Sequence, residues 1–177
     1  MSGYLEDDRG MSYVTWRQHR QRASEMRDQL PDLTSVLDEY ARNLKIMIDI
    51  GREKSVRLIF LTQPTIWRAD LPQDLDSLLW VGGIGDYQRQ PGRPYYSAAA
   101  LERGMKAFND TLLRVCRERQ IECLDLASAL QKDTTVFYDD VHFNESGARK
   151  IAQTLSGYML ERPPFRASHP DPPTLTR

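Results

Sequence analysis

Two short apolar runs with a helical segment between them place the strongest constraint on the fold. Residues 56–62 are too few for a helix and rich in bulky apolar side chains, which predicts a strand buried on both faces of a parallel sheet. Residues 121–125 form a second such run. Between the runs, Ser97 can cap a helix whose apolar positions recur at helical spacing: Leu101, Met105, Phe108, Leu112, Val115 and Cys116. A strand, a helix and a strand in this order predict a parallel β-α-β crossover.

Two further amphipathic segments flank this unit. Residues 35–38 have the pattern of a capping box that starts the first segment, and Gly51 is placed to end it. The apolar positions of this segment are Leu37, Tyr40, Ala41, Leu44, Met47 and Ile48. The second segment lies at the C-terminal end of the unit. Its expected buried face consists of Ala148, Ile151, Ala152, Leu155 and Met159. With 177 residues and 40% hydrophobic content, the chain suits one α/β domain whose helices cover a parallel sheet.

The two ends of the chain differ from this central pattern. Residues 11–30 carry sparse apolar side chains among Arg, Gln and Glu, so we expect a partly exposed helix within an N-terminal helical segment, 1–34. The α/β pattern itself occupies 35–160. Residues 161–177 contain two Pro-Pro pairs, which predict a disordered Pro-rich tail.

Charge and hydropathy exclude several classes of partner. The formal net charge is -1, from 24 basic and 25 acidic residues, and no long block of one sign is present, so we expect no nucleic-acid partner. No apolar run is long enough to span a bilayer, and residues 1–10 are polar and acidic where a signal peptide is basic and then apolar. We therefore expect no membrane segment in this chain. Its compartment and its oligomeric state stay open.

The two cysteines do not define a site. Cys116 and Cys123 have no further cysteine or histidine at ligand spacing, so they do not make a zinc site, and two cysteines make no disulfide framework. We expect both to be packing residues, and we leave open whether they are bridged. No metal or cofactor is predicted.

The strongest candidate for a functional site is the stretch Phe-Tyr-Asp-Asp-Val-His-Phe-Asn-Glu-Ser-Gly at residues 137–147. Asp139 precedes His142 by three residues, so its carboxylate can turn back and accept a hydrogen bond from one ring nitrogen. This leaves the other nitrogen to act as a base. Asn144 can cap the helix that follows, and Gly147 allows that helix to pack closely in its first turn.

Other candidate site residues follow the first predicted strand. Ligands of open α/β sheets bind outside the carboxyl ends of the strands, so Gln63, Thr65 and Trp67 are candidates for substrate binding; a proline-defined strand exit with Trp67 as a packing residue explains them equally well. The long segment 68–96 is apolar and rich in Gly and Pro, which predicts a substrate-side insertion or lid. Its aromatic residues can stack on a sugar ring or pack in the core: Trp80, Tyr95 and Tyr96.

Residues 137–147 resemble the last conserved block of the SGNH hydrolases, also called the GDSL esterase/lipase family. That block holds an Asp-x-x-His motif, so the resemblance implies His142 as the base and Asp139 as its orienting acid. Asp140 occupies the variable position, and we expect Asp140→Asn to be mild. The Thr-Gln-Pro that ends the first strand at 62–64 is a further, weaker likeness. The implied fold is a three-layer α/β/α arrangement with a parallel sheet, flavodoxin-like and N-terminally truncated.

The resemblance covers about residues 35–160, which correspond to the C-terminal half of the family's domain. The family carries its nucleophile in a Gly-Asp-Ser motif after a strand, followed by glycine and asparagine oxyanion donors. Here the nearest imitation is Gly10-Met11-Ser12, with no apolar strand before it, so we do not expect Ser12 to be the nucleophile. Three explanations stay open: a truncated gene or misassigned start, which is the simplest, a degenerate pseudoenzyme, or a half-domain completed by another chain.

The function that the resemblance implies is ester hydrolysis. We expect an acylesterase that acts on an O-acyl group of a carbohydrate or on a small ester, using a Ser-His-Asp triad of which this chain carries only the acid and the base. The chain by itself is then expected to be inactive. The alternative is a catalytically inactive SGNH-like binding or scaffold module.

Overall fold

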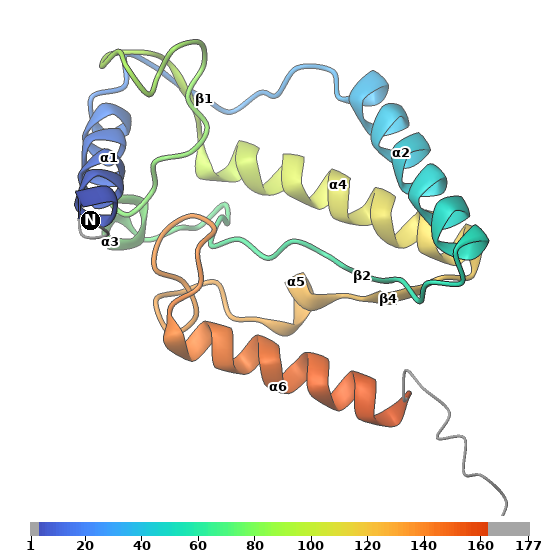
Figure 1. Ribbon diagram of the computed structural model, residues 1–177. Coiled ribbons are helices and arrows are strands. Elements are labelled where there is room, and N and C mark those ends of the chain that lie inside the picture. Colours follow the sequence, from blue (N-terminus) through green and yellow to red (C-terminus); the bar gives the residue numbers. More distant parts are fainter. Residues whose placement is uncertain (1–3, 163–177) are drawn as a thin grey trace, which may run out of the picture.

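The computed structural model describes the backbone of residues 4–162 and the side chains of residues 10–162. The predicted tail at 161–177 lies, apart from its first two residues, outside the described part. In chain order the elements are α1 (Tyr4–Gln21), β1 (Met26–Arg27), α2 (Thr34–Glu53), β2 (Ile59–Leu61), α3 (Gln73–Asp76), β3 (Tyr95–Tyr96), α4 (Ala98–Arg119), β4 (Glu122–Leu124), α5 (Leu126–Ala129) and α6 (Glu145–Glu161). The fold class is therefore α/β, as predicted (Figure 1).

The predicted β-α-β crossover is confirmed. Strands β2 and β4 pair in parallel, with Phe60 opposite Cys123, and α4 connects them. In Figure 1, α4 and α6 run on either side of this strand pair. A second, smaller parallel pair joins β1 to β3, with Met26 opposite Tyr95. It ties the segment after α1 to the segment before α4.

Strand β2 is shorter and more exposed than the sequence predicts. All three of its residues are only half-buried, whereas the apolar run predicts burial on both faces. Thr62 N–H donates to Leu124 O, and parallel strands alternate the neighbour that they bond, so the backbone groups of Ile59 and Leu61 point away from β4. No strand in the described part of the chain pairs with that edge. We call the unpaired side of β2 the open edge.

The core consists of two clusters. The first is formed mainly where α2 packs against α4, and the partly buried Phe60 and Cys123 of the β2–β4 pair pack against it. Its buried members are Ala41, Leu44, Ile48, Leu112, Val115 and Cys116. Cys116 also forms a disulfide with Cys123, across a Cα–Cα distance of 6.2 Å. The second cluster supports the site, and its buried members are Ile66, Trp67, Leu75, Leu79, Val136 and Phe137.

Both predicted ends of α2 are wrong by a few residues. The helix starts at Thr34, and Leu33 at its N-cap provides no side-chain hydrogen bond. Instead, Asp32 Oδ1 accepts hydrogen bonds from Thr34 N at 2.9 Å and from Thr34 Oγ1 at 2.6 Å, so a turn before the helix replaces the capping box. The helix continues through Gly51 to Glu53. A Cβ at Gly51 would lie 2.6 Å from Leu58 Cδ1, so this glycine allows a close approach and does not end the helix.

Segment 68–96 is partly packed, and its prediction as a substrate-side insertion or lid stays a prediction. It contains α3 and β3. Leu75 and Leu79 are buried in the second core cluster, and Tyr95 is fully buried. Part of the segment therefore packs in the interior, whereas Trp80 of the same segment stays half-buried.

Helix α6 is less buried than its apolar pattern predicts. Gly147 is its one buried residue among those the structure describes. Ile151, Leu155 and Met159 are half-buried, and Ala148 and Ala152 are exposed. The helix is attached near its C-terminus, where Tyr158 Oη donates to Glu122 Oε2 at 3.1 Å.

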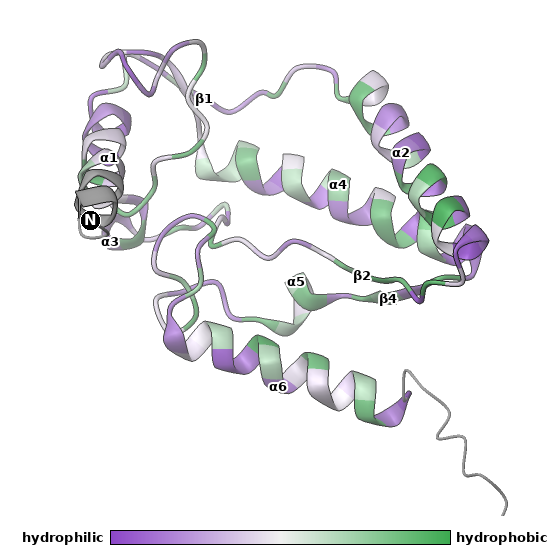
Figure 2. Ribbon diagram, in the orientation of Figure 1, coloured by the Kyte–Doolittle hydropathy of each residue, from purple (hydrophilic) through white to green (hydrophobic). Residues whose placement is uncertain are grey.

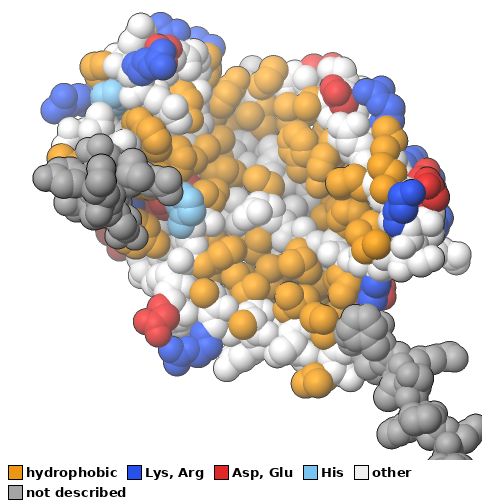
Figure 3. Space-filling view, in the orientation of Figure 1, with side chains coloured by type: hydrophobic (Ala, Val, Ile, Leu, Met, Phe, Trp, Pro, Cys, Tyr) orange, Lys and Arg blue, Asp and Glu red, His pale blue; other side chains and the backbone are white. Residues whose placement is uncertain are grey.

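Several apolar side chains remain exposed in the described part of the chain. Figure 2 colours β2 and β4 as hydrophobic, and Figure 3 shows apolar side chains gathered across the hollowed middle of the same face. On α2 and the turn after it, four apolar residues are about half exposed: Ile46, Met47, Ile50 and Val56. None of the helices in the described part of the chain is both long enough and apolar enough to cross a membrane.

Candidate active site

The site is built on a hairpin-like loop that enters α6. Phe137 and Phe143 form an antiparallel bridge, and Tyr138 N–H donates to His142 O at 2.8 Å. These contacts bring the two ends of the loop together. As a result, the side chain of Asp139 lies beneath that of His142.

Asp139 and His142 form the pair that their spacing predicts. His142 Nδ1 lies 2.9 Å from Asp139 Oδ2 and 3.1 Å from Oδ1. The backbone N–H groups of His142 and Val141 donate to Asp139 Oδ1, at 2.9 and 3.1 Å. An ionised carboxylate only accepts hydrogen bonds, so it places the imidazole proton on Nδ1 and leaves the lone pair of Nε2 available as a base.

Burial separates the roles of the two residues. The Asp139 side chain is fully buried, whereas the His142 side chain is 49% exposed. Burial raises the pKa of Asp139, but the hydrogen bonds from His142, Val141 and Trp80 outweigh it, so the net pKa is lowered. The carboxylate therefore stays ionised to a lower pH than an ordinary aspartate does. The half-exposed imidazole is accessible to a reacting group.

The residues after His142 fix the start of α6 as predicted. Asn144 Oδ1 accepts from Gly147 N at 2.8 Å and caps the helix. Asn144 Nδ2 donates to Thr134 O at 2.7 Å, which ties the cap to the turn before the loop. A Cβ at Gly147 would overlap Val136 O, so the glycine is required by the close contact.

An aromatic wall lies beside the histidine, formed by Tyr13, Trp16 and Trp80. Trp80 Nε1 donates to Asp139 Oδ2 at 3.1 Å, and its ring stacks against the imidazole of His142 with centroids 6.3 Å apart. The Tyr13 ring lies 5.4 Å from the imidazole, edge to face, and the Trp16 ring lies 5.0 Å from that of Trp80. All three rings are half-buried. The wall can therefore contact a ligand bound at His142.

Tyr13 and Trp16 were not predicted as site residues. The helix that carries them was placed in a separate N-terminal segment, because a polar helix gives no sign of what it packs against. The one available signal was the spacing of three residues between the two aromatic side chains, which puts them on one face of a helix.

The six predicted substrate-binding residues do not lie together. Only Trp80 joins His142. Trp67 is 5% exposed and Tyr95 is fully buried, so neither can stack on a ligand, and the packing alternative is correct for both. Tyr96 is half-buried, and its backbone N–H donates to Gly82 O at 2.9 Å.

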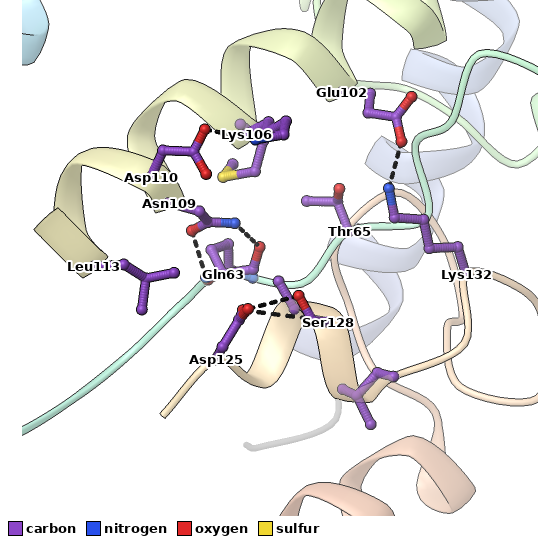
Figure 4. Close-up of a pocket in the computed structure, with 13 residues that line it drawn as sticks. Gln63, Thr65, Glu102, Lys106, Asn109, Asp110, Leu113, Asp125, Ser128 and Lys132 are labelled. Carbon is purple, nitrogen blue, oxygen red and sulfur yellow. Dashed lines mark hydrogen bonds and ion pairs between the residues drawn. The ribbon is translucent and has the colours of Figure 1, made fainter. Parts of the chain in front are cut away.

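The remaining two, Gln63 and Thr65, line a separate cavity of about 480 Å³ between α4 and α5 (Figure 4). His142 is not among the residues that line it. Asn109 holds the loop there, since its side chain accepts from Gln63 N at 2.8 Å and donates to Gln63 O at 2.9 Å.

Four of the five charged side chains around this cavity form ion pairs, and the fifth, Asp125, accepts hydrogen bonds from Thr62 and Ser128. Lys132 lies 2.6 Å from Glu102, and Lys106 lies 2.6 Å from Asp110. Because these groups satisfy each other, the cavity gives no indication of the ligand that it could bind.

Asp140 has a more important place in the structure than the variable position of the motif predicts. Its side chain is fully buried. Asp140 Oδ1 accepts from Trp67 Nε1 at 2.9 Å, and Oδ2 accepts from Trp80 N at 2.6 Å. Asp140 makes no contact with the imidazole of His142 among these bonds, which agrees with the prediction that Asp139 is the orienting acid.

Ser12 lies inside α1, so it is not presented on a turn between a strand and a helix, where the serine of the SGNH family stands. The described residues also contain no group of three or more His, Cys, Asp or Glu side chains that could hold a metal ion.

No protein-family model, curated protein or solved structure matches this chain. The assignment of a function therefore rests on the residues of the site and on their geometry.

The pKa values of the two adjacent aspartates are shifted in opposite directions. Burial raises the pKa of Asp140, and its hydrogen bonds only partly oppose the shift, whereas the pKa of Asp139 is lowered. Asp139 therefore contributes stability that is present above its unfolded pKa and is lost as the pH falls through its lower folded pKa. The contribution of Asp140 has the opposite sign. As the pH rises from its unfolded pKa to its raised folded pKa, the carboxyl ionises more readily in the unfolded chain, so the stability of the folded protein falls. The side-chain carboxyl ¹³C shifts, followed from pH 7 downward, should show Asp140 protonating first; the reverse order would contradict the burial argument.

Proposed function

We propose that this chain carries the base and the orienting acid of an ester hydrolase of the SGNH type. The observation that carries the proposal is the pairing of a fully buried carboxylate with a half-exposed imidazole, Asp139 with His142. This geometry suits general-base catalysis, because the acid is shielded from water while Nε2 of the base can reach a substrate.

The chemistry follows from the tautomer. His142 Nε2 takes the proton of a serine hydroxyl while the serine oxygen attacks the ester carbonyl. The imidazolium then gives that proton to the departing alcohol, which leaves an acyl-enzyme, and water repeats the cycle to release the acid. Asp139 stabilises the imidazolium throughout. In this proposal the serine and the oxyanion donors come from a polypeptide segment outside the 177 residues.

The open edge of β2 supports that part of the proposal. A two-stranded sheet is marginal by itself. No strand in the described part of the chain pairs with the open edge of β2, and apolar side chains of α2 are exposed. Further parallel strands added at this edge would produce the three-layer α/β/α, flavodoxin-like arrangement of the SGNH family. They would also cover the apolar side chains.

The aromatic wall supports the proposed substrate class. Tyr13, Trp16 and Trp80 present half-buried rings next to His142, and aromatic faces bind the apolar faces of sugars and acyl chains. We propose an O-acylated carbohydrate or a small ester. The alternative function is a binding or scaffold module without catalysis, which the same wall and the open edge could serve.

Sequencing and expressing the longest open reading frame that contains this chain distinguishes the two functions. We expect this reading frame to encode an upstream strand followed by Gly-Asp-Ser, and the expressed protein to hydrolyse p-nitrophenyl acetate. His142→Ala should abolish that turnover, while the control His19→Gln should retain it, since His19 bonds Tyr87 O and takes no part in the pair. A stop codon directly upstream of Met1 would favour the scaffold module.

The 177-residue chain by itself should be nearly inert in the same assay. Losing one oxyanion donor typically lowers kcat about 10²- to 10³-fold, and the members of a triad act as a unit. Turnover by this chain at ordinary enzyme rates would contradict the proposal that the nucleophile lies elsewhere.

A further inference from the structure

We propose that Asp140 is a positioning residue, which holds Trp80 so that the Trp80 indole can donate to Asp139. The inference rests on the proposed function only in treating Asp139 and His142 as the reacting pair. Asp140 itself does not touch the imidazole, and it acts through the residue that does.

The first step of the argument is the double role of Trp80. Its backbone N–H donates to Asp140 Oδ2 at 2.6 Å, and its indole Nε1–H donates to Asp139 Oδ2 at 3.1 Å. The backbone bond to a fully buried carboxylate fixes where the Cα of Trp80 lies, and this sets the reach of the ring. The same ring stacks on His142. Trp80 therefore links the two aspartates without any direct bond between them.

The second step is that Asp140 is itself held on three sides. Trp67 Nε1 donates to Asp140 Oδ1 at 2.9 Å. The backbone of Asp140 is fixed as well, because its carbonyl accepts from Ile66 N at 3.0 Å. A buried carboxylate with no donors is strongly unfavourable, and here both oxygens have one. The carboxylate is therefore a rigid acceptor for Trp80.

The third step is that a buried cation, Arg20, binds the backbone of Val81, the residue after Trp80. The Arg20 side chain is 2% exposed. Arg20 Nη1 donates to Val81 O at 2.9 Å and to Tyr96 O at 3.0 Å. Asp140 thus binds the N–H of Trp80 while Arg20 binds the C=O of Val81, so two buried charges of opposite sign fix consecutive residues of one segment.

This inference replaces the expectation that Asp140→Asn is mild. Asparagine at this position has one acceptor oxygen and one NH₂ group. Trp67 Nε1–H and Trp80 N–H are both donors, so one of them would face the NH₂ group and lose its partner.

The test uses the indole N–H signals of the full chain, whose three tryptophans are Trp16, Trp67 and Trp80. In Asp140→Asn, the Trp80 indole N–H should exchange with solvent about tenfold faster or more, which corresponds to the loss of one hydrogen bond to a charged group. Trp67→Phe is the matched variant, because it removes the other donor to Asp140 and leaves the Trp80 backbone bond in place. Because the bonds from Trp80 N–H and Ile66 N–H remain, Trp80 exchange should change much less in that variant than in Asp140→Asn. The control Asp70→Asn, at a side chain that is 87% exposed, should alter no indole signal.

An unchanged Trp80 indole in folded Asp140→Asn would overturn the proposal and leave Asp140 as a packing partner of Trp67. If Asp140→Asn does not fold, the wild-type chain gives the same test. As the pH falls, the Trp80 indole signal should shift together with the side-chain carboxyl carbon of Asp140; a shift that follows only Asp139 would equally overturn the proposal. These signals do not depend on turnover, so a failure of the proposed hydrolase activity would leave the result readable.

Discussion

Gly147→Ala is expected to be the most destabilising small substitution in α6 and to displace the His142 loop. The added Cβ would overlap the carbonyl oxygen of Val136 and come close to its carbonyl carbon and Cα. All three are backbone atoms, so no side chain can rotate away to make room. Overpacking a well-packed site typically costs about 1–3 kcal/mol, and we expect the upper end of that range because α6 must shift as a unit.

The shift of α6 would also loosen the site. Asn144 caps α6 through the N–H of Gly147 and bonds Thr134 with its side-chain amide. Moving the first turn breaks one of these contacts, and His142 lies two residues before the cap. Besides a lower melting temperature, Gly147→Ala should therefore weaken the hydrogen bond between His142 Nδ1 and Asp139, visible as faster exchange of the imidazole N–H.

Gly157→Ala is the matched control on the same helix. A Cβ at Gly157 meets nothing within 4 Å, and alanine is about 0.5–1 kcal/mol more favourable than glycine inside a helix. This variant should melt at a slightly higher temperature than the wild type, with the His142 signals unchanged. If Gly147→Ala were equally harmless, the close contact between α6 and Val136 would be wrong.

The sequence predicted local elements of this fold well, because their causes are local. The capping serine of α4 is confirmed by the bond from Ala100 N to Ser97 Oγ at 3.1 Å. The Asp139–His142 pair could likewise be predicted, since three residues of chain and one turn bring the two side chains together. The parallel pairing of β2 with β4 followed from the β-α-β order of the pattern.

Contacts between distant segments could not be predicted in the same way. Trp80 lies 59 residues from Asp139 along the chain, and Trp67 lies 73 residues from Asp140. From the sequence, an indole in an apolar segment is equally consistent with a core residue and with a ligand contact. Only the packing of the second core cluster determines which of the two roles each indole has. Trp67 and Tyr95 became buried, whereas Trp80 stayed half-exposed beside the histidine.

Burial was overpredicted for the strand and for the last helix, for one shared reason. The apolar run at 56–62 and the apolar stripe of α6 are the patterns of elements that pack on both sides of a sheet. In the described part of the chain the sheet has only two strands, so Ile59, Leu61 and Ile151 remain half-buried. These sequences are therefore suited to a larger sheet than the one that the described residues form.

Asp139→Asn should have the largest effect on catalysis after the loss of His142 itself. Asp139 Oδ1 accepts from two backbone N–H groups, those of Val141 and His142, so the single oxygen of asparagine must stay on that side. Its NH₂ group would then point at His142 Nδ1 and Trp80 Nε1. Because NH₂ can only donate, it forces the imidazole proton onto Nε2, and the base loses its lone pair.

The expected result is a kcat on the order of 10⁴-fold lower in the complete hydrolase, the loss that this substitution causes in a Ser-His-Asp triad. The change of tautomer can also be measured in the 177-residue chain without any substrate. The ¹⁵N shifts of the His142 ring should show the proton on Nδ1 in the wild type and on Nε2 in Asp139→Asn. Asp140→Asn should leave the proton on Nδ1, because its oxygens do not contact the ring. If Asp140→Asn lowered turnover more than Asp139→Asn, or moved the proton to Nε2, the assignment of Asp139 as the orienting acid would be wrong.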